Sequence, residues 1–417
     1  MGKGSLIIFV SLKADKSSFE LLASHCKGTN PFTPLLYSNK LFDSLSPQFD
    51  SSVQFSIPPI GAFPFHSDLA FISKKQSFAT FSFCNVWGLR NLSISHHLKS
   101  KVKKDLHSID FSRYSSVQIV GVETHYFILS ICNYIKKRIP HSSVTIVVPD
   151  LPEFMNGGKS HFFYRLAKKV DNHRIYALLK TTSDGYVFLS DSMKSFFDVQ
   201  TKPYQVLEGI SQAPFLPEEL HLVPKRIVYT GRTDLAYSDL DVLCEAIALL
   251  KKEDPQYELV VAGSGGGDAF LKSKAEAGEL RYLGSLTPDE TIALQQSAAV
   301  LVCMRKPLER FKYAFPSKIL DYCRVGRPIV SNCSASFPQE YQKIVLVPSS
   351  DHPEDVAKVI QKAASLSPSE LEQTKADSDL LCQSKGPANV SRIFETLFAQ
   401  YRNEAPSLKN GQDKKPQ

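Results

Sequence analysis

The sequence lacks the features that mark several large classes of protein. Its eight cysteines, at positions 26, 84, 132, 244, 303, 323, 333 and 382, form no C-x-x-C pair and no cluster with histidine. We therefore expect reduced, mostly buried thiols in a cytoplasmic protein, with no metal site and no cofactor. No segment approaches the roughly 20 apolar residues that a membrane-spanning helix needs. The apolar run 6–12 ends at Lys13 without a small-residue cleavage site, which favours a first β-strand over a signal peptide.

The common nucleotide-binding signatures are also missing. No G-x-G-x-x-G is followed by an acid about twenty residues later, and there is no G-x-x-x-x-G-K-[ST], which disfavours a dehydrogenase or a P-loop protein. Asp239 and Asp241 match D-x-D, but they lie at the start of an expected helix, where acidic side chains complement the helix dipole. No repeat of 20 to 50 residues is present.

Charge is nearly balanced, with 49 basic and 42 acidic residues and a formal net charge of +7. Basic residues gather in three groups of the first half: Lys99, Lys101, Lys103 and Lys104; Lys136, Lys137 and Arg138; Arg165, Lys168 and Lys169. Solvated helix faces explain them most simply, and attraction to an anionic membrane or a phosphorylated acceptor is the alternative. A nucleic-acid-binding protein is disfavoured because no aromatic-basic recognition module is present.

At 417 residues the chain exceeds the usual size of one hydrophobic core. Short β-branched runs alternate with helical patterns in the second half, at 226–230, 258–262, 300–304, 328–331 and 343–347, which predicts βαβ units in a parallel sheet. Thr287 to Glu290 predicts a capping box, and a helix is expected from Ser317 to just before Gly326.

The first half repeats the pattern less clearly, with strands expected at 5–12, 117–121, 144–148, 185–190 and 204–207 and helices near 126–137 and 162–180. Residues 26–95 show no clear organisation. We predict an α/β protein of two Rossmann-like domains with parallel sheets facing across a cleft. The expected parts are an acceptor domain (1–210), a linker (211–225), a donor domain (226–387), a helix packing back toward the first domain (388–402) and a disordered tail (403–417).

Three loops at strand ends of the second half carry groups suited to a phosphate ligand. Gly231 lets the backbone approach a ligand, and the neighbouring Arg232 offers a bidentate guanidinium. The glycine run that begins with Gly263, Ser264 and Gly265 suits either a nucleotide contact or a simple flexible turn.

The third loop opens the helix with Pro316, Ser317 and Lys318, where free N–H groups and a lysine favour an anion. Asp321 lies one turn on, so its carboxylate can face the same ligand and accept hydrogen bonds from ribose hydroxyls.

In combination and order, residues 226–347 resemble the C-terminal signature of retaining, GT-B-fold glycosyltransferases of family 4, especially those of bacterial exopolysaccharide and capsule assembly. The resemblance implies transfer of a sugar from a nucleotide sugar, most often a UDP-sugar, to a saccharide or lipid-linked acceptor. It also implies that cationic side chains, and not a metal, stabilise the leaving diphosphate. By position, Arg232 becomes the diphosphate arginine and Asp321 the ribose acid.

The chain departs from the family pattern where a first acid is expected, because that position is Tyr313. Lys318 is expected to supply the positive charge that usually follows the Gly-Arg turn. In the first half, Asp150 and His125 stand after strands at positions similar to the acceptor-side residues of the family. The missing acid leaves an alternative open, a catalytically silent nucleotide-sugar-binding or scaffold subunit of a polysaccharide assembly complex.

Overall fold

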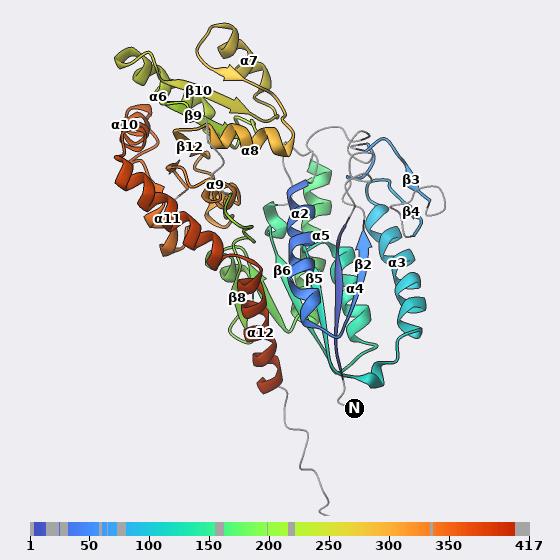
Figure 1. Cartoon of the computed structure of the whole chain (residues 1–417). Coiled ribbons are helices and arrows are strands. Elements are labelled where there is room, and N and C mark those ends of the chain that lie inside the picture. The colour runs from blue at the N-terminus through green and yellow to red at the C-terminus, as the bar shows by residue number, and fades with distance from the viewer. Residues whose placement is uncertain are drawn as a thin grey trace, which may run out of the picture.

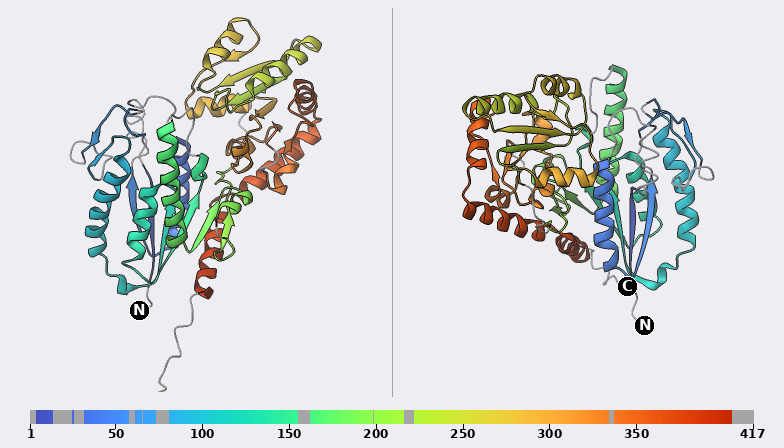
Figure 2. Two further views of the ribbon diagram at one scale, coloured as in Figure 1. Left: turned by 180° about the vertical axis from the view of Figure 1, so that it is seen from behind. Right: turned by 45° about the horizontal axis from the view of Figure 1, so that its top comes forward.

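The structure, a computed structural model, describes residues 4–13, 25, 32–57, 61–64, 66–72, 81–154, 162–197, 199–215, 222–333 and 337–404. Two six-stranded parallel sheets occupy separate halves of the molecule in every view (Figures 1 and 2). One is built from residues 4–206 and the other from residues 226–346. Cys26, the central linker residues 216–221 and the tail from 405 lie outside the described residues, as does the side chain of Arg165.

The N-terminal sheet has the strand order β2-β1-β5-β6-β7-β8. Alternate residues of β1 face opposite sides, as the two-residue period of a strand requires. Leu6 and Ile8 belong to the core beneath α3, α4 and α5, whereas Ile7 and Phe9 pack toward α2 and α12. The strands are β1 (Gly4–Leu12), β2 (Ser51–Ile57), β5 (Tyr114–Val122), β6 (Ser142–Val148), β7 (Gly185–Phe188) and β8 (Tyr204–Val206). The helices are α2 (Phe32–Leu45), α3 (Arg90–His107), α4 (Tyr126–Lys136) and α5 (Phe162–Thr182).

The C-terminal sheet has the order β11-β10-β9-β12-β13-β14 and is also covered on both faces. Tyr229 and Val261 face α6 and α10, and Val228 and Val260 face α9 and α11. Its strands are β9 (Arg226–Thr230), β10 (Glu258–Ala262), β11 (Arg281–Tyr282), β12 (Val300–Cys303), β13 (Ile329–Ser331) and β14 (Val345–Leu346). Its helices are α6 (Leu240–Glu253), α7 (Asp268–Glu276), α8 (Pro288–Gln296), α9 (Lys318–Cys323), α10 (Pro353–Ala364) and α11 (Pro368–Ser384).

The strand predictions for the second half are confirmed, and β9 and β10 have the predicted bounds. The capping box at the start of α8 is confirmed as well, because Thr287 and Glu290 exchange side-chain and backbone hydrogen bonds. The sequence missed α2, β2, the whole of α3 and a short antiparallel pair, β3 (Ala70–Phe71) with β4 (Phe83–Cys84). The seven described cysteines are all free thiols, as predicted.

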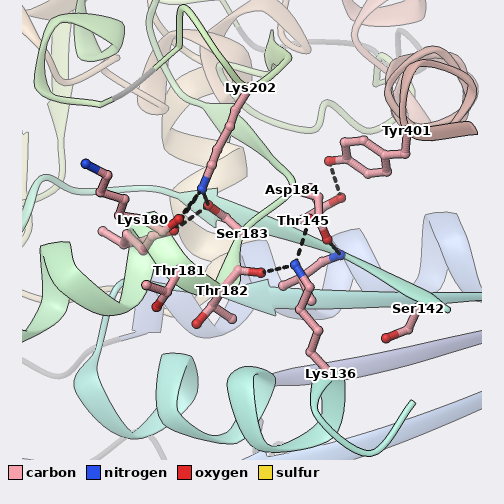
Figure 3. A network of polar contacts seen from close by, with 12 residues as sticks. Lys136, Ser142, Thr145, Lys180, Thr181, Thr182, Ser183, Asp184, Lys202 and Tyr401 are labelled. Atoms are coloured by element: carbon pink, nitrogen blue, oxygen red, sulfur yellow. Dashed lines mark hydrogen bonds and ion pairs between the residues drawn. The ribbon is translucent and has the colours of Figure 1, made fainter. Parts of the chain in front are cut away.

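The last helix, α12 (Pro387–Glu404), returns to the N-terminal domain and packs Val390, Phe394 and Leu397 against its sheet (Figure 1). Figure 3 shows Tyr401 directed at Thr145 of β6, with their hydroxyl oxygens 2.8 Å apart. Gly185 permits this approach, because a Cβ at that position would lie 2.5 Å from the Tyr401 hydroxyl.

The two chain crossings between the domains are joined to each other. Lys385, at the end of α11, places Nζ 2.9 Å from the Glu208 carboxylate and 2.7 Å from that of Glu340. The Ser211 amide donates to the Lys385 carbonyl oxygen at 2.9 Å. None of the helices in the described part of the chain is long and apolar enough to cross a membrane.

Candidate functional site

The loops after β9 and β10 touch at the carboxyl end of the C-terminal sheet, and glycine makes this contact possible. A Cβ on Gly263, whose φ is +142°, would lie 1.6 Å from the Gly231 carbonyl oxygen. Gly231 also has a positive φ, +122°, and a Cβ there would meet the Lys318 side chain. Both glycines are therefore required by close approach and by backbone conformation. The two expected glycine positions are thus brought together.

The rest of the glycine run differs from the expected phosphate contact. The Gly265 amide donates to Asp268 Oδ1 at 2.7 Å, and the Gly266 amide donates to Asp234 Oδ1 at 2.6 Å. Ser264 is exposed, and its carbonyl oxygen accepts from the Thr233 amide at 3.3 Å. In this structure the run seats one loop against the other, and a donor contact through the Gly265 amide requires the Asp268 carboxylate to give way.

Lys318 is a cation that contacts both the Tyr229 ring and the Gly231 backbone. Its Nζ lies 4.1 Å from the centre of the Tyr229 ring and directly over Gly231. Burial lowers the pKa of Lys318, but the Tyr229, Tyr322 and Cys303 side chains raise it by more, so the net shift is upward. The ammonium group therefore stays charged at neutral pH.

The helix that carries Lys318, α9, begins at Lys318, next to the predicted start at Ser317. Ser317 has a helical backbone conformation, with φ −51° and ψ −24°, and its hydroxyl makes no capping hydrogen bond. Pro316 instead accepts the first hydrogen bond of the turn, from the Ile319 amide at 2.9 Å. Because α9 has only six residues, its dipole is weak, and the anion-attracting group at this position is the Lys318 side chain.

Asp321 lies on the same short helix and is solvent-exposed. The surrounding protein raises the pKa of Asp321 by desolvation, while Lys40, Arg324 and Lys318 lower it by a smaller amount. Lys40 belongs to α2, so a cation of the N-terminal domain lies within electrostatic reach of the expected ribose acid. The structure therefore places Lys318 and Asp321 in one neighbourhood at the domain junction.

Arg232 directly follows Gly231 in the sequence, and its side chain has partners of its own. Its guanidinium forms an ion pair with Asp234 and stacks 5.2 Å from the centre of the Tyr237 ring. The side chain is 53% exposed, so its charge is available to a ligand that displaces Asp234. Arg232 is linked to Lys318 through Tyr229. The Tyr229 hydroxyl donates to the Arg232 carbonyl oxygen at 2.6 Å, and the Tyr229 ring contacts the Lys318 ammonium group.

Two further cations at the junction were missed by the sequence analysis. The Arg305 guanidinium stacks 4.9 Å from the centre of the Phe311 ring and is near enough to lower the pKa of Lys318. Arg310 donates from Nη2 to the Phe154 carbonyl oxygen of the N-terminal domain at 2.9 Å. Arg305 had a signal, since it directly follows the strand 300–304.

The acceptor-side residues lie at the carboxyl end of the N-terminal sheet. Burial raises the pKa of Asp150, while the opposing Arg310 and Arg305 lower it by less. His125 precedes α4, and its ring stacks on Phe127 at 5.1 Å. Burial, with the charges of Arg90 and Lys168, lowers the pKa of His125 to about 3, so the imidazole is neutral and a weak base.

Glu123, which the sequence analysis also missed, directly follows β5. It has a φ of +89°, a left-handed conformation that is strained for glutamate, and it is only 3% exposed. Its Oε1 is buried without a hydrogen-bond partner among the described residues. Burial and the nearby Asp150 raise the pKa of Glu123 to about 8. Strained backbone with an unsatisfied acid is a common mark of a functional position.

Tyr313, which replaces the expected first acid, belongs to the contact between the domains. Its ring stacks on Phe154 at 5.9 Å and meets the edge of Phe196 at 4.9 Å. Its carbonyl oxygen accepts from the Ser190 hydroxyl at 2.7 Å. The position thus performs interdomain packing.

The D-x-D pair is explained by local structure. Lys306 Nζ lies 2.6 Å from Asp239 and 2.8 Å from Asp241 at the start of α6. Both carboxylates are therefore neutralised within the domain, as expected for charge placement at a helix N-terminus.

Comparison with known proteins finds a family match for the C-terminal half of the chain. Residues 224–365 match the family described as glycosyl transferases group 1. An uncharacterized glycosyltransferase of Haemophilus influenzae is 24% identical over 166 residues, which cover 39% of this chain and 46% of that relative. The match thus spans less than half of the relative's length.

Solved structures align over nearly the whole chain. Sucrose-phosphate synthase from Thermosynechococcus elongatus aligns with a TM-score of 0.58 and 11% identity, over 96% of this chain and 99% of that one. HepE of Anabaena, in complex with UDP and glucose, aligns with a TM-score of 0.54 and 10% identity, over 94% and 99%. The galactosyltransferase WaaB of the lipopolysaccharide outer core gives 0.54 and 11%, over 95% and 99%. The protein therefore has the GT-B fold, and its residues 224–365 match the group 1 glycosyltransferase domain.

Proposed function

We propose that the protein is a retaining, metal-independent glycosyltransferase that moves a sugar from a nucleotide-sugar donor to a saccharide or lipid-linked acceptor. The observation that carries the proposal is Lys318, a charged ammonium held over Gly231 within reach of Asp321. Such a cation beside two ligand-accessible loops suits a departing diphosphate. The group 1 domain match gives independent support.

On the donor side, each group has a distinct task. Lys318 stabilises the negative charge that grows on the leaving diphosphate, and Arg305 adds a second charge on the same side. Arg232 exchanges Asp234 for a phosphate oxygen, which a guanidinium binds in a bidentate manner. Asp321 accepts hydrogen bonds from the ribose hydroxyls.

On the acceptor side, carboxyl groups face these cations. Asp150 orients the acceptor hydroxyl, and the positive charges of Arg305 and Arg310 lie within electrostatic reach of its carboxylate across the junction. His125 is neutral and offers a hydrogen bond to a sugar hydroxyl, not proton abstraction. In a retaining reaction the leaving phosphate itself takes the hydroxyl proton, so no strong protein base is required.

UDP-sugar is the proposed donor, and an exopolysaccharide or another glycoconjugate the proposed product. The similar HepE protein binds UDP and glucose, which supports that donor class. We also propose that this protein is cytoplasmic and contacts an anionic membrane peripherally. Trp87, Leu89 and Leu92 are exposed at the start of α3, and Lys103 and Lys104 are exposed further along the same helix.

The test is a thermal-shift screen of nucleoside diphosphates and nucleotide sugars on the full chain, followed by an assay of acceptor-dependent nucleotide release. A saturating ligand that binds the folded state raises the melting temperature. We expect stabilisation by one base class, and loss of that stabilisation in Lys318→Ala. Stabilisation by no nucleotide would contradict the proposal.

The alternative, a silent nucleotide-sugar-binding or scaffold subunit, is favoured by one observation. Tyr313 stands where the family has an acid, and its ring is committed to Phe154 and Phe196. Both functions predict donor binding. Donor binding with no acceptor-dependent release, across saccharide and lipid-linked acceptors, would favour the scaffold.

A further inference from the structure

Three side chains of the N-terminal domain converge, one from His25 and two from the loop that carries His66 and Asp68. Among the described residues, His25, His66 and Asp68 place one ligand atom each within 4.8 Å of one another. His25 Nδ1 lies 3.5 Å from Asp68 Oδ2, and His66 Nδ1 lies 4.0 Å from the same oxygen. The imidazole rings of the two histidines are 5.9 Å apart.

These spacings suit one transition-metal ion. Zinc binds histidine nitrogen and carboxylate oxygen at about 2.0–2.2 Å, so ligand atoms around a tetrahedral ion lie about 3.4 Å apart. Two imidazoles and one carboxylate form a borderline donor set that zinc accepts readily. His25 is 47% exposed, so the fourth position opens toward water, as in sites with three protein ligands.

The two ligands nearest in sequence are held in place before any ion binds. His66 is fully buried and packs 5.3 Å from the Phe71 ring. The buried Asn85 side chain donates to the Asp68 carbonyl oxygen at 3.0 Å and so fixes the loop that carries both ligands. Preorganisation of this kind is what supporting contacts supply in metal sites.

The third ligand is brought to this loop by its own backbone. The His25 carbonyl oxygen accepts from the Ser67 amide at 3.0 Å. The Asp68 amide donates to His66 Nδ1 at 3.1 Å, and an ion at Nδ1 replaces that contact. One neutral hydrogen bond is weak beside three metal–ligand bonds, so the exchange favours the ion.

We propose that His25, His66 and Asp68 bind one zinc ion that joins His25 to the loop before β3. The site is structural and separate from sugar transfer, since none of the three residues belongs to the donor or acceptor groups. Its two loop ligands, His66 and Asp68, lie in the region 26–95, where the sequence shows no clear organisation and where a metal crosslink adds stability.

The test uses the full chain freed of any histidine tag and stripped with a chelator. Zinc binding is measured by competition with a chromogenic chelator, and cobalt(II) serves as a spectroscopic probe of tetrahedral nitrogen and oxygen ligands. We expect one zinc per chain, a higher melting temperature with zinc, and visible cobalt bands. His25→Ala and Asp68→Asn should each weaken zinc binding roughly 100-fold or more.

The control is His96→Ala, which removes one of two adjacent exposed histidines on α3, whose rings are 5.2 Å apart. It should bind zinc as the wild type does. His25 and Asp68 are partly exposed, so their variants should fold, and their metal-free melting temperatures check this. The proposal is overturned if the wild type binds no zinc, or if neither variant weakens binding.

Discussion

The two faces that meet at the domain junction carry opposite chemistry. The C-terminal face presents cations on loops shaped by glycine, Lys318 and Arg305 among them. The N-terminal face presents acids at strand ends, and Glu123 and Asp150 among them are desolvated enough to have raised pKa values. This division suits the proposed glycosyl transfer, because negative charge grows on the leaving group while the acceptor presents a neutral, oriented hydroxyl.

The difference extends to what holds each face. The C-terminal face depends on backbone contacts between two loops. These contacts leave no room for a side chain at Gly263. The N-terminal face is held by buried side chains and includes the strained backbone of Glu123. Mutations should therefore damage the first face through folding and the second through protonation.

A large loss of folding stability is expected from Gly263→Ala. The added Cβ would overlap the Gly231 carbonyl oxygen at a strained positive φ, so the free energy of unfolding should fall by at least about 3 kcal/mol. Urea denaturation measures this. Gly278→Ala is the matched control, because its φ is +73° but no atom lies within 4 Å of the new Cβ, and it should cost only about 1 kcal/mol. Equal costs would show that the loop contact is not what fixes the C-terminal face.

Removing the charge of Lys318 should be next. Lys318→Met keeps the packing on Tyr229 but loses the ammonium group, so donor turnover should fall roughly 100-fold, about 2.7 kcal/mol. Steady-state assays of nucleotide release measure it, with exposed Lys272→Met as the control. Unchanged turnover in Lys318→Met would contradict the assignment of the leaving-group charge to the C-terminal face.

The N-terminal face should make the free energy of unfolding depend on pH through Glu123. The folded chain keeps a proton on Glu123 up to pH about 8, whereas the unfolded chain releases it near 4.5. Between these values the free energy of unfolding should fall as pH rises, with a slope of up to about 1.4 kcal/mol per pH unit from this group. Below pH 4.5 the stabilisation from the protonated Glu123 is fully present, and above about pH 8 it is lost.

Urea midpoints at several pH values test this, with Glu123→Gln as the comparison. The amide mimics the protonated carboxyl, so the variant should show a flatter profile than the wild type. Profiles of identical slope would mean that Glu123 is ionised in the fold.

The smallest effect is expected at Tyr401. Tyr401→Phe removes the hydroxyl contact with Thr145 while keeping the ring, and should cost about 1 kcal/mol of stability. Thermal denaturation measures it, and Tyr204→Phe, which loses an exposed hydrogen bond to Asp191, should cost less. A reversed order would argue that α12 packs by its apolar face alone.

The C-terminal domain could be predicted from the sequence because its signals are local. The α8 capping box and the β-branched runs of β9 and β10 each fit within a few residues. In contrast, α2 has no acid in its first turn and no base in its last. In α3, Ile94, Leu98 and Val102 do recur at helical spacing, and that signal was available.

The site was predictable to the same extent. Lys318 and Asp321 follow from one short segment. Arg310 and Asp150 are neighbours only because the two domains meet, and no sequence pattern records that placement. The positive φ of Glu123 is likewise a property of the folded turn.

The return of α12 to the first domain has a mechanical consequence. The chain passes between the domains twice, and Lys385 fastens the outgoing passage, at Glu208 and Ser211, to the returning one. Two passages tied at one point restrain sliding and leave rotation about that point as the easiest relative movement. Opening to admit a donor should therefore be a hinge rotation of the two domains about the Lys385 contact, which moves Lys318 and Asp150 apart.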